Sequence, residues 1–140
     1  MKKDKATAQW ILYAESDLAL AGQKRTSKKI LYETLCFHCQ QAAEKALKAV
    51  LIFYDVHFDR THDISLLLRL LKSNGVAIPK AVEQSKSLSD YAVTVRYPGD
   101  EEIIDSKEFK SALKISKQVL DWANLEINNE ESSLFKKQTK

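Results

Sequence analysis

The most informative polar stretch of the chain reads QQAAEKALK, at Gln40–Lys48. If this stretch is helical, Gln41 and Lys45 share one face, because residues four apart are neighbours on a helix. Glu44 and Lys48 then form an ion pair of the favourable orientation on the neighbouring face. Taken alone, the stretch is typical of a solvated helix flank, in which such a pair adds a few tenths of a kcal/mol of stability. Only its combination with other motifs of the chain favours a binding role.

The second stretch joins a guanidinium and a phenol at Arg96-Tyr97, where a predicted helix ends before Pro98-Gly99. The planar fork of an arginine is suited to phosphate, and a tyrosine ring can stack on a base. The alternative interpretation is structural. Arg96 would then pair with an acid such as Asp90 or Glu44, and Tyr97 would fill the end of a helical bundle.

A third polar cluster, Thr61-His62-Asp63, adds an imidazole to these groups. Its simplest interpretation is capping of the helix that follows. His62 is also one of only three histidines in the chain, so it is a candidate for any step that needs an imidazole.

Cys36, His38 and Cys39 could offer ligands to a metal within one helical turn. A structural zinc site needs four ligands, however, and the others would have to come from a separate region that holds His57 and His62. Both cysteines fall on apolar helix positions, where thiols act as small buried hydrophobic groups. We expect no metal site. Because the sequence also lacks a Gly-rich phosphate loop and a nucleophile beside a His and an acid, we expect no cofactor.

The elements that position these groups are predicted to be helices, because apolar residues recur at steps of three and four through most of the chain. We expect a first helix over Asp4–Arg25, which Gly22 and the polar stretch Gln23–Lys29 end or fray in its last turn. Further helices are expected from Lys28 to about Tyr54, from a cap at Thr61 to Asn74-Gly75, from Pro79 to Pro98-Gly99 as one stripe, and from an N-cap at Asp105 onward. Tyr91–Tyr97 also alternates like a strand. We reject that interpretation, because a lone strand would leave its backbone groups unsatisfied.

The second of these helices carries two adjacent apolar stripes rich in alanine. Together they are wider than one partner helix can cover, so we place this helix at the centre of the fold. Its small side chains would let neighbouring backbones, or a second subunit, come close. We therefore expect a homodimer in which this helix and the last one carry most of the buried contacts.

Length and composition agree with one helical domain. The chain has 140 residues with only three Gly and two Pro, too few for the frequent turns of a β-sandwich or barrel. We assign residues 1–128 to a helical bundle and 129–140 to a polar, mobile tail. The formal net charge of +3 is too small to indicate by itself a protein that binds nucleic acid. No apolar run is long enough to span a membrane. We expect a cytoplasmic protein with reduced thiols.

The three stretches in this order resemble the HEPN family, the higher eukaryotes and prokaryotes nucleotide-binding domain. They read CFHCQQAAEKALK at Cys36–Lys48, THD at Thr61–Asp63 and RYP at Arg96–Pro98. The segment from Trp10 to Leu18 is similar to the family's W…A…DL opening, and the resemblance continues to Trp122. It implies an up-and-down bundle of four or five α-helices. It also implies dimerisation, roles with nucleotides or RNA, and pairing of small prokaryotic members with a minimal nucleotidyltransferase in a toxin–antitoxin-like module.

HEPN ribonucleases resemble one another in an R-x4-6-H motif, whose Arg and His cleave RNA without metal. Arg96 stands where this Arg could fall, but the positions where the His would follow hold Glu101, Glu102 and Ile103. Without an imidazole there, no ready group can move protons for the ribose hydroxyl or the leaving oxygen. A ribonuclease would have to take its histidine from elsewhere in the chain, from His62 or His38.

The resemblance therefore implies a non-catalytic HEPN protein with a pocket for a nucleotide or phosphate near the subunit junction. The residues expected in this pocket are Gln41, Lys45, Arg96 and Tyr97, with Lys45 and Arg96 close together. The expected partners are a second copy of the chain, a minimal nucleotidyltransferase, and a nucleotide or RNA, with no membrane. Two alternatives stay open: a metal-independent ribonuclease toxin that uses Arg96 and His62, and a dimeric helical adaptor whose polar cluster is structural.

Overall fold

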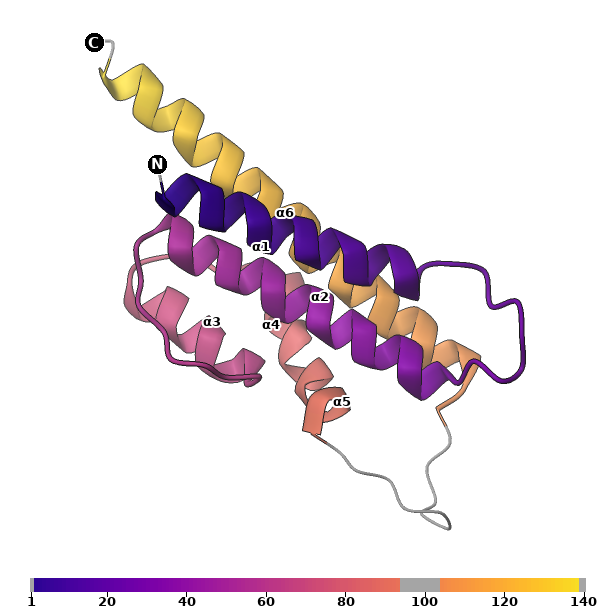
Figure 1. The fold of residues 1–140 in the computed structure, drawn as a ribbon. Helices are drawn as coiled ribbons and strands as arrows, with labels where there is room; N and C mark the ends of the chain where they lie inside the picture. Colours follow the sequence, from indigo (N-terminus) through magenta and orange to yellow (C-terminus); the bar gives the residue numbers. More distant parts are fainter. Residues whose placement is uncertain (1, 94–103, 139–140) are drawn as a thin grey trace.

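The computed structural model describes residues 2–93 and 104–138, and the regular elements in these ranges are all helical (Figure 1). In chain order they are α1 (Lys2–Ala21), α2 (Tyr32–Phe53), α3 (Ile64–Ser73), α4 (Lys80–Glu83), the 3-10 helix η1 (Gln84–Ser89), α5 (Asp90–Val93) and α6 (Ser106–Gln138). The predicted all-α bundle is confirmed. Of the stretch that alternates like a strand, Tyr91–Val93 is helical and the rest lies outside the described residues.

Helix α2 lies at the centre, as its double apolar stripe predicts. It contacts α1 and α6, which lie alongside it, as well as α3, η1 and α5. Helix α1 runs antiparallel to α2 and α6 (Figure 1). Four alanines of α2 are fully buried within one chain, at positions 42, 43, 46 and 49. These small side chains therefore serve the close packing of the chain's own helices, and they are not available to form the subunit interface that we expected on α2.

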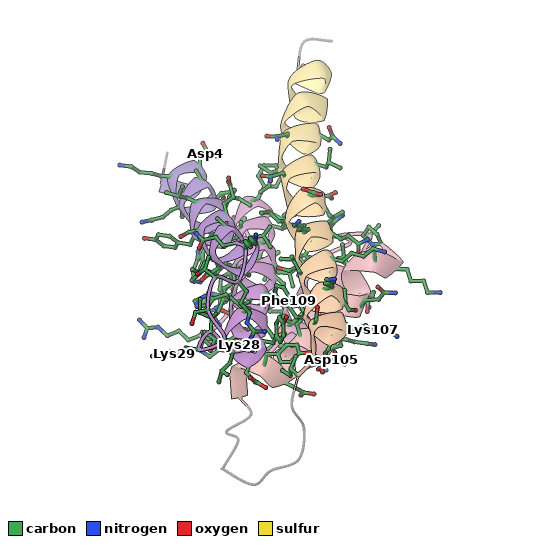
Figure 2. All side chains as sticks on the ribbon, turned by 90° about the vertical axis from the view of Figure 1, so that its right-hand side faces the viewer. Asp4, Lys28, Lys29, Asp105, Lys107 and Phe109 are labelled. Carbon is green, nitrogen blue, oxygen red and sulfur yellow. The ribbon has the colours of Figure 1, made fainter. Side chains whose placement is uncertain are left out.

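The connection between α1 and α2 is longer than the sequence predicts. Helix α1 ends at Ala21, directly before Gly22, where we expected it to end or fray, whereas α2 begins at Tyr32, four residues after the predicted start at Lys28. The connection brings the beginning of α2 to the beginning of α6, where the ring of Tyr32 stacks on that of Phe109 with centroids 5.5 Å apart. In Figure 2, Lys28 and Lys29 of this connection lie on one side of the start of α6 and Lys107 on the other.

The polar cluster before α3 does cap that helix, but through a different residue than predicted. Asp63 is the N-cap, and its carboxylate accepts a hydrogen bond from the backbone N–H of Leu66. The hydroxyl oxygen of Thr61 instead accepts a hydrogen bond from the backbone N–H of Asp63 and so helps to hold this N-cap residue in place. At the other end Asn74 is the C-cap, and Gly75 follows with a φ of 85°, which confirms the predicted Asn-Gly stop.

The segment after Pro79 is not the single α-helix that the apolar stripe predicts, because a 3-10 helix interrupts it between α4 and α5. Serine hydroxyls account for the change. Ser85 donates to the carbonyl of Val82, and Ser87 donates to that of Gln84. Such local bonds compete with the regular i to i−4 pattern of the backbone.

Helix α6 begins as predicted and ends later. The carboxylate of Asp105 accepts from the backbone N–H of Glu108 at 2.8 Å, which confirms Asp105 as the N-cap. The helix then continues to Gln138, across the boundary we drew at residue 128, because neither Gly nor Pro interrupts this polar stretch. The mobility of residues 129–140 stays a prediction. Among the described helices, none combines the length and apolar character that a membrane crossing requires.

Candidate functional site

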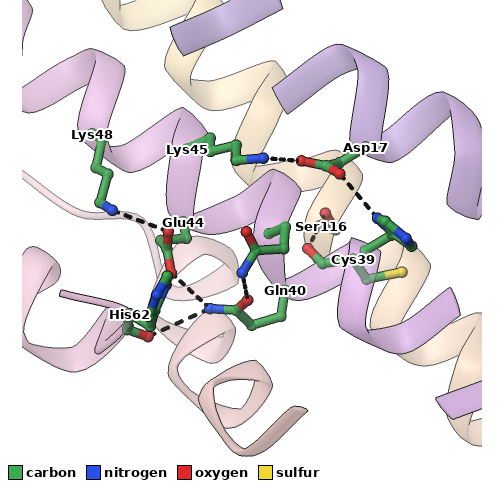
Figure 3. A network of polar contacts seen from close by, with 10 residues as sticks. Asp17, Cys39, Gln40, Glu44, Lys45, Lys48, His62 and Ser116 are labelled. Atoms are coloured by element: carbon green, nitrogen blue, oxygen red, sulfur yellow. Dashed lines mark hydrogen bonds and ion pairs between the residues drawn. The ribbon is translucent and has the colours of Figure 1, made fainter. Parts of the chain in front are cut away.

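The predicted phosphate-binding residues fall into two groups. Gln41 and Lys45 lie on α2, while Arg96 and Tyr97 lie outside the described residues. The expected proximity of Lys45 and Arg96 therefore stays a prediction. The two residues on α2 belong to two polar networks on the surface of this helix, which Figure 3 shows together.

The first network, the Asp17 cluster, consists of Asp17 on α1 with His38 and Lys45 on α2. Nζ of Lys45 lies 2.6 Å from Oδ2 of Asp17, and Nδ1 of His38 lies 2.9 Å from its Oδ1. One carboxylate thus holds both side chains and ties α1 to α2. An anion that approaches Lys45 has to compete with Asp17, so Lys45 is less free to bind phosphate than its position in the sequence suggests.

The second network, the His62 site, consists of Gln40, Glu44, Lys48 and His62. Nζ of Lys48 lies 3.0 Å from Oε2 of Glu44, and Nδ1 of His62 lies 2.8 Å from Oε1. The solvated flank that we considered for Glu44 and Lys48 is wrong, because their side chains are only 2% and 8% exposed. The ammonium group of Lys48 also lies 5.2 Å from the centroid of the Trp10 ring, where a cation is attracted to the face of the indole.

Gln40 links the groups of the His62 site, and Gln41 joins the site through Gln40. The side chain of Gln40 is fully buried and donates to Glu44 at 3.1 Å and to the backbone carbonyl of His62 at 3.4 Å. Gln41, predicted to bind phosphate, donates instead to the side-chain oxygen of Gln40 at 2.7 Å. Glu44 thus holds the ring of His62 while Gln40 holds its backbone. The structure brings Gln41 and His62 into one network and places Lys45 in the other.

His62 is the most exposed member of its site, with 64% of its side chain accessible. Because Nδ1 faces the carboxylate of Glu44, Nε2 is the nitrogen left for an incoming group. A neutral imidazole held in this way has its lone pair on Nε2, and a protonated one donates an N–H from the same position. Carboxylates orient histidines similarly at metal sites and in hydrolase triads. This arrangement can bind a phosphate oxygen or accept a proton.

The two cysteines are buried and do not take part in either network through their thiols. Burial, with a smaller contribution from the neighbouring Cys36, raises the pKa of Cys39 to about 12. The backbone carbonyl of Cys39 accepts a hydrogen bond from Ser116 of α6 at 2.8 Å. The segment of α2 that carries the cysteines is therefore part of the packed interior, as the apolar pattern predicts.

Sequence reasoning missed Asp17, which orders Lys45 and His38. Its partner Lys45 is 28 residues away along the chain, so no local spacing reveals the contact. The only signal was the W…A…DL pattern of the first helix, in which Asp17 is the acidic residue.

Comparison with known proteins decides the family. A family model described as the HEPN domain matches residues 7–128. The chain belongs to the HEPN family. It is also similar to the crystal structure of an archaeal HEPN homologue, with 28% sequence identity and a TM-score of 0.69 over 86% of this chain and 97% of that one. No curated protein matches the chain.

The three histidines of this HEPN domain all precede Arg96. No histidine follows residue 62, so Arg96 is not succeeded by one at the spacing of the HEPN ribonuclease motif. The described histidine with a buried carboxylate behind it and an exposed ring is His62, which precedes Arg96. A histidine that took part in acid–base chemistry in this domain would have to lie outside the motif.

Proposed function

We propose that this HEPN chain is a non-catalytic, cytoplasmic protein that binds the phosphate of a nucleotide or RNA, and that it works with a minimal nucleotidyltransferase in a toxin–antitoxin-like module. The observation that carries the binding role is the exposed imidazole of His62, held at its Nδ1 by the buried Glu44. A ring fixed in this way loses little conformational freedom when it contacts a ligand.

The proposed pocket contains the four residues predicted from the sequence, with His62 added to them. The four are Gln41, Lys45, Arg96 and Tyr97. Gln41 is linked to His62 through Gln40, which supports a common location for Gln41 and His62. Lys45 contributes positive charge to this face of α2, although Asp17 neutralises part of it. Arg96 would supply the planar fork that suits a phosphate, and Tyr97 a ring that can stack on a base.

The lack of catalysis follows from the same residues. A guanidinium stabilises the negative charge that develops on a phosphate but does not serve as a base at neutral pH. Loss of general acid–base catalysis lowers a rate by about a hundred- to ten-thousand-fold. Without a spaced histidine after Arg96, we expect RNA cleavage to be slow or absent.

Binding can be tested by titrating the protein with ATP and with a short fluorescent single-stranded RNA. We expect His62→Ala to weaken binding of the ligand by about tenfold, the equivalent of one good polar contact. His57→Ala is the matched control, because the His57 side chain is 88% exposed and, among the described residues, pairs with Asp59, which is 97% exposed. Absence of binding in the wild type, or equal binding by His62→Ala, would overturn the proposed site.

A second candidate function, a metal-independent ribonuclease that uses Arg96 and His62, is favoured by one specific observation. The contact between His62 and Glu44 has the geometry of an imidazole oriented by a carboxylate to act as a general base. An RNA cleavage assay free of divalent metal separates the two functions. Strong cleavage by the wild type that both His62→Ala and Arg96→Ala abolish would establish the ribonuclease and overturn the non-catalytic proposal.

The partnership can be tested by co-expression. If the neighbouring reading frame encodes a small nucleotidyltransferase, we expect it to co-purify with this chain. A homodimer is part of the proposal as well, and sedimentation at micromolar concentration tests it. A monomer at that concentration would count against dimerisation, and a nucleotidyltransferase that fails to co-purify would count against the module.

A further inference from the structure

Four lysines form a stripe along the first half of α6. Lys107, Lys110, Lys114 and Lys117 recur at steps of three, four and three residues, and all four are exposed. At 3.6 residues per turn they lie within an arc of about 80° on the helix surface. The opposite side of the same turns is buried and includes Ser116, which contacts α2. The stripe therefore faces away from α2 and from the His62 site.

The connection between α1 and α2 carries further cations, across the start of α6 from this stripe. Lys24, Lys28 and Lys29 are exposed, and Figure 2 shows Lys28 and Lys29 on one side of the start of α6 and Lys107 on the other. Two contacts fix this position: the stacking of Tyr32 on Phe109, and the backbone N–H of Ile104, which donates to Glu33 at 3.1 Å. We call the four lysines of the stripe the lysine surface.

The charges of the lysine surface are not neutralised within the described part of the chain. None of its lysines forms an ion pair with a described residue, in contrast to Lys45 and Lys48. The acids at the start of α6 are engaged elsewhere, because Asp105 caps the helix and Glu108 accepts a hydrogen bond from the hydroxyl of Tyr91. Asp121, one turn beyond Lys117, marks the end of the stripe.

We infer that the lysine surface binds the phosphate backbone of RNA. The inference rests on the proposed function: if the ligand of the His62 pocket is RNA, the lysine surface is a second place where the protein contacts the same RNA. The stripe spans about 15 Å along the helix axis, the length of about four successive phosphates of one strand in a duplex. Lysines contact phosphates as point charges, and contacts to phosphates carry no information about base sequence. The binding is therefore independent of base sequence.

An anionic membrane fits this surface less well. A helix that binds at a membrane surface buries an apolar face among the lipids. The apolar face of α6 is instead packed inside the protein, with Ala112, Val119 and Ala123 each at most 3% exposed. Along the lysine stripe, the apolar side of α6 is therefore not free to insert into a membrane.

The test compares two triple variants of the full chain that lose the same charge. In the first, Lys107, Lys110 and Lys117 are changed to Gln. In the control, Lys5, Arg69 and Lys86 are changed to Gln, since all three are exposed and lie on other elements. Binding of a labelled RNA duplex of arbitrary sequence is followed by fluorescence anisotropy over a series of salt concentrations, after circular dichroism shows that both variants are folded.

We expect the α6 variant to bind RNA at least about tenfold more weakly and the slope of log K against log salt to become shallower by about two to three, because each lost phosphate contact removes about 0.7 to 0.9 from it. The control should keep the slope of the wild type. Equal losses in both variants, or wild-type binding by the α6 variant, would overturn the inference.

The outcomes also separate this inference from the proposed function. RNA binding that His62→Ala weakens but the α6 variant leaves unchanged would overturn the lysine surface alone. Absence of RNA binding by a wild type that still binds ATP would overturn the lysine surface and the RNA form of the proposed function, and absence of binding to both ligands would overturn the proposed function as well. Vesicles that contain phosphatidylserine provide the membrane comparison, and lysine-dependent binding to these vesicles without RNA binding would assign the surface to lipid instead.

Discussion

Nδ1 of His62 lies 2.8 Å from Oε1 of Glu44, although 64% of the histidine side chain is exposed and only 2% of the glutamate is. A buried carboxylate therefore orients a ring that solvent and ligands can reach. Glu44 accepts hydrogen bonds from Gln40 and Lys48 as well, so the same carboxylate serves both the stability of α2 and the position of His62.

We expect Glu44→Gln to destabilise the fold by about 3 kcal/mol, because removing one member of a buried ion pair leaves the other charge uncompensated. Lys48 would keep its ammonium group with no carboxylate beside it. Urea unfolding measures the change. Glu15→Gln is the control, since Glu15 is exposed, and it should change the free energy of unfolding by less than about 0.5 kcal/mol. A loss below about 1 kcal/mol for Glu44→Gln would show that Lys48 finds another partner or reaches solvent.

The Asp17 cluster should contribute less, because its members are partly exposed. Asp17→Asn removes the charge that holds Lys45 and His38, and we expect a loss of roughly 1 to 2 kcal/mol. The exposed Asp121 offers a matched Asp→Asn control. If both substitutions cost the same in thermal or urea unfolding, the link that Asp17 makes between α1 and α2 does not stabilise the fold.

The capping of α3 can be tested by two alanine substitutions two residues apart. Asp63→Ala should cost about 1 kcal/mol, because the N–H of Leu66 loses its acceptor at the helix start. Thr61→Ala removes only the acceptor for the N–H of Asp63 and should cost less. The free energies of unfolding of the two variants decide the order, and a larger loss for Thr61→Ala would restore the cap predicted from the sequence.

Alkaline pH should destabilise the protein through Cys39. Its pKa is about 12 in the folded state because of burial, against 9.0 for a free thiol. Between these values the unfolded thiol releases its proton while the folded one keeps it, so the unfolded state binds fewer protons and stability falls as pH rises, by roughly 1 kcal/mol per pH unit. Burial also raises the pKa of Tyr91, which acts in the same direction.

Urea unfolding between pH 8 and 11 under reducing conditions measures this dependence. Cys39→Ala removes the titrating thiol and should flatten the decline, while the contribution of Tyr91 remains. Identical pH profiles for the two proteins would show that the folded thiol ionises as readily as the unfolded one.

The parts of the fold that depend on local chemistry follow from the sequence. The apolar periodicity marks the helices, Asp105 begins the last one, and Gly75 closes α3 because its positive φ suits a glycine. The 3-10 turns at Gln84–Ser89 are less predictable. The apolar stripe there continues at helical spacing, and only the serine hydroxyls, whose bonding depends on the final backbone, divert it.

The candidate site, too, has features that the local sequence predicts and features that depend on how the helices pack. Gln41, Lys45 and His62 were recognised by type and spacing, but their partners depend on tertiary packing. Asp17 reaches Lys45 from another helix, and the approach of His62 covers Glu44, which looks like a surface residue in the linear pattern. Spacing on one helix cannot tell a solvated face from one covered by a distant loop.

The indole of Trp10 beside the ammonium group of Lys48 places a natural fluorophore at the buried charges. The chain has one other tryptophan, Trp122 on α6, so Trp122→Phe leaves an emission spectrum that comes from Trp10 alone. A change in the electric field that the charges of Lys48 and Glu44 exert on the indole would shift the emission maximum of Trp10. Occupation of the neighbouring His62 could therefore be followed optically, with no label attached to the protein or to its ligand.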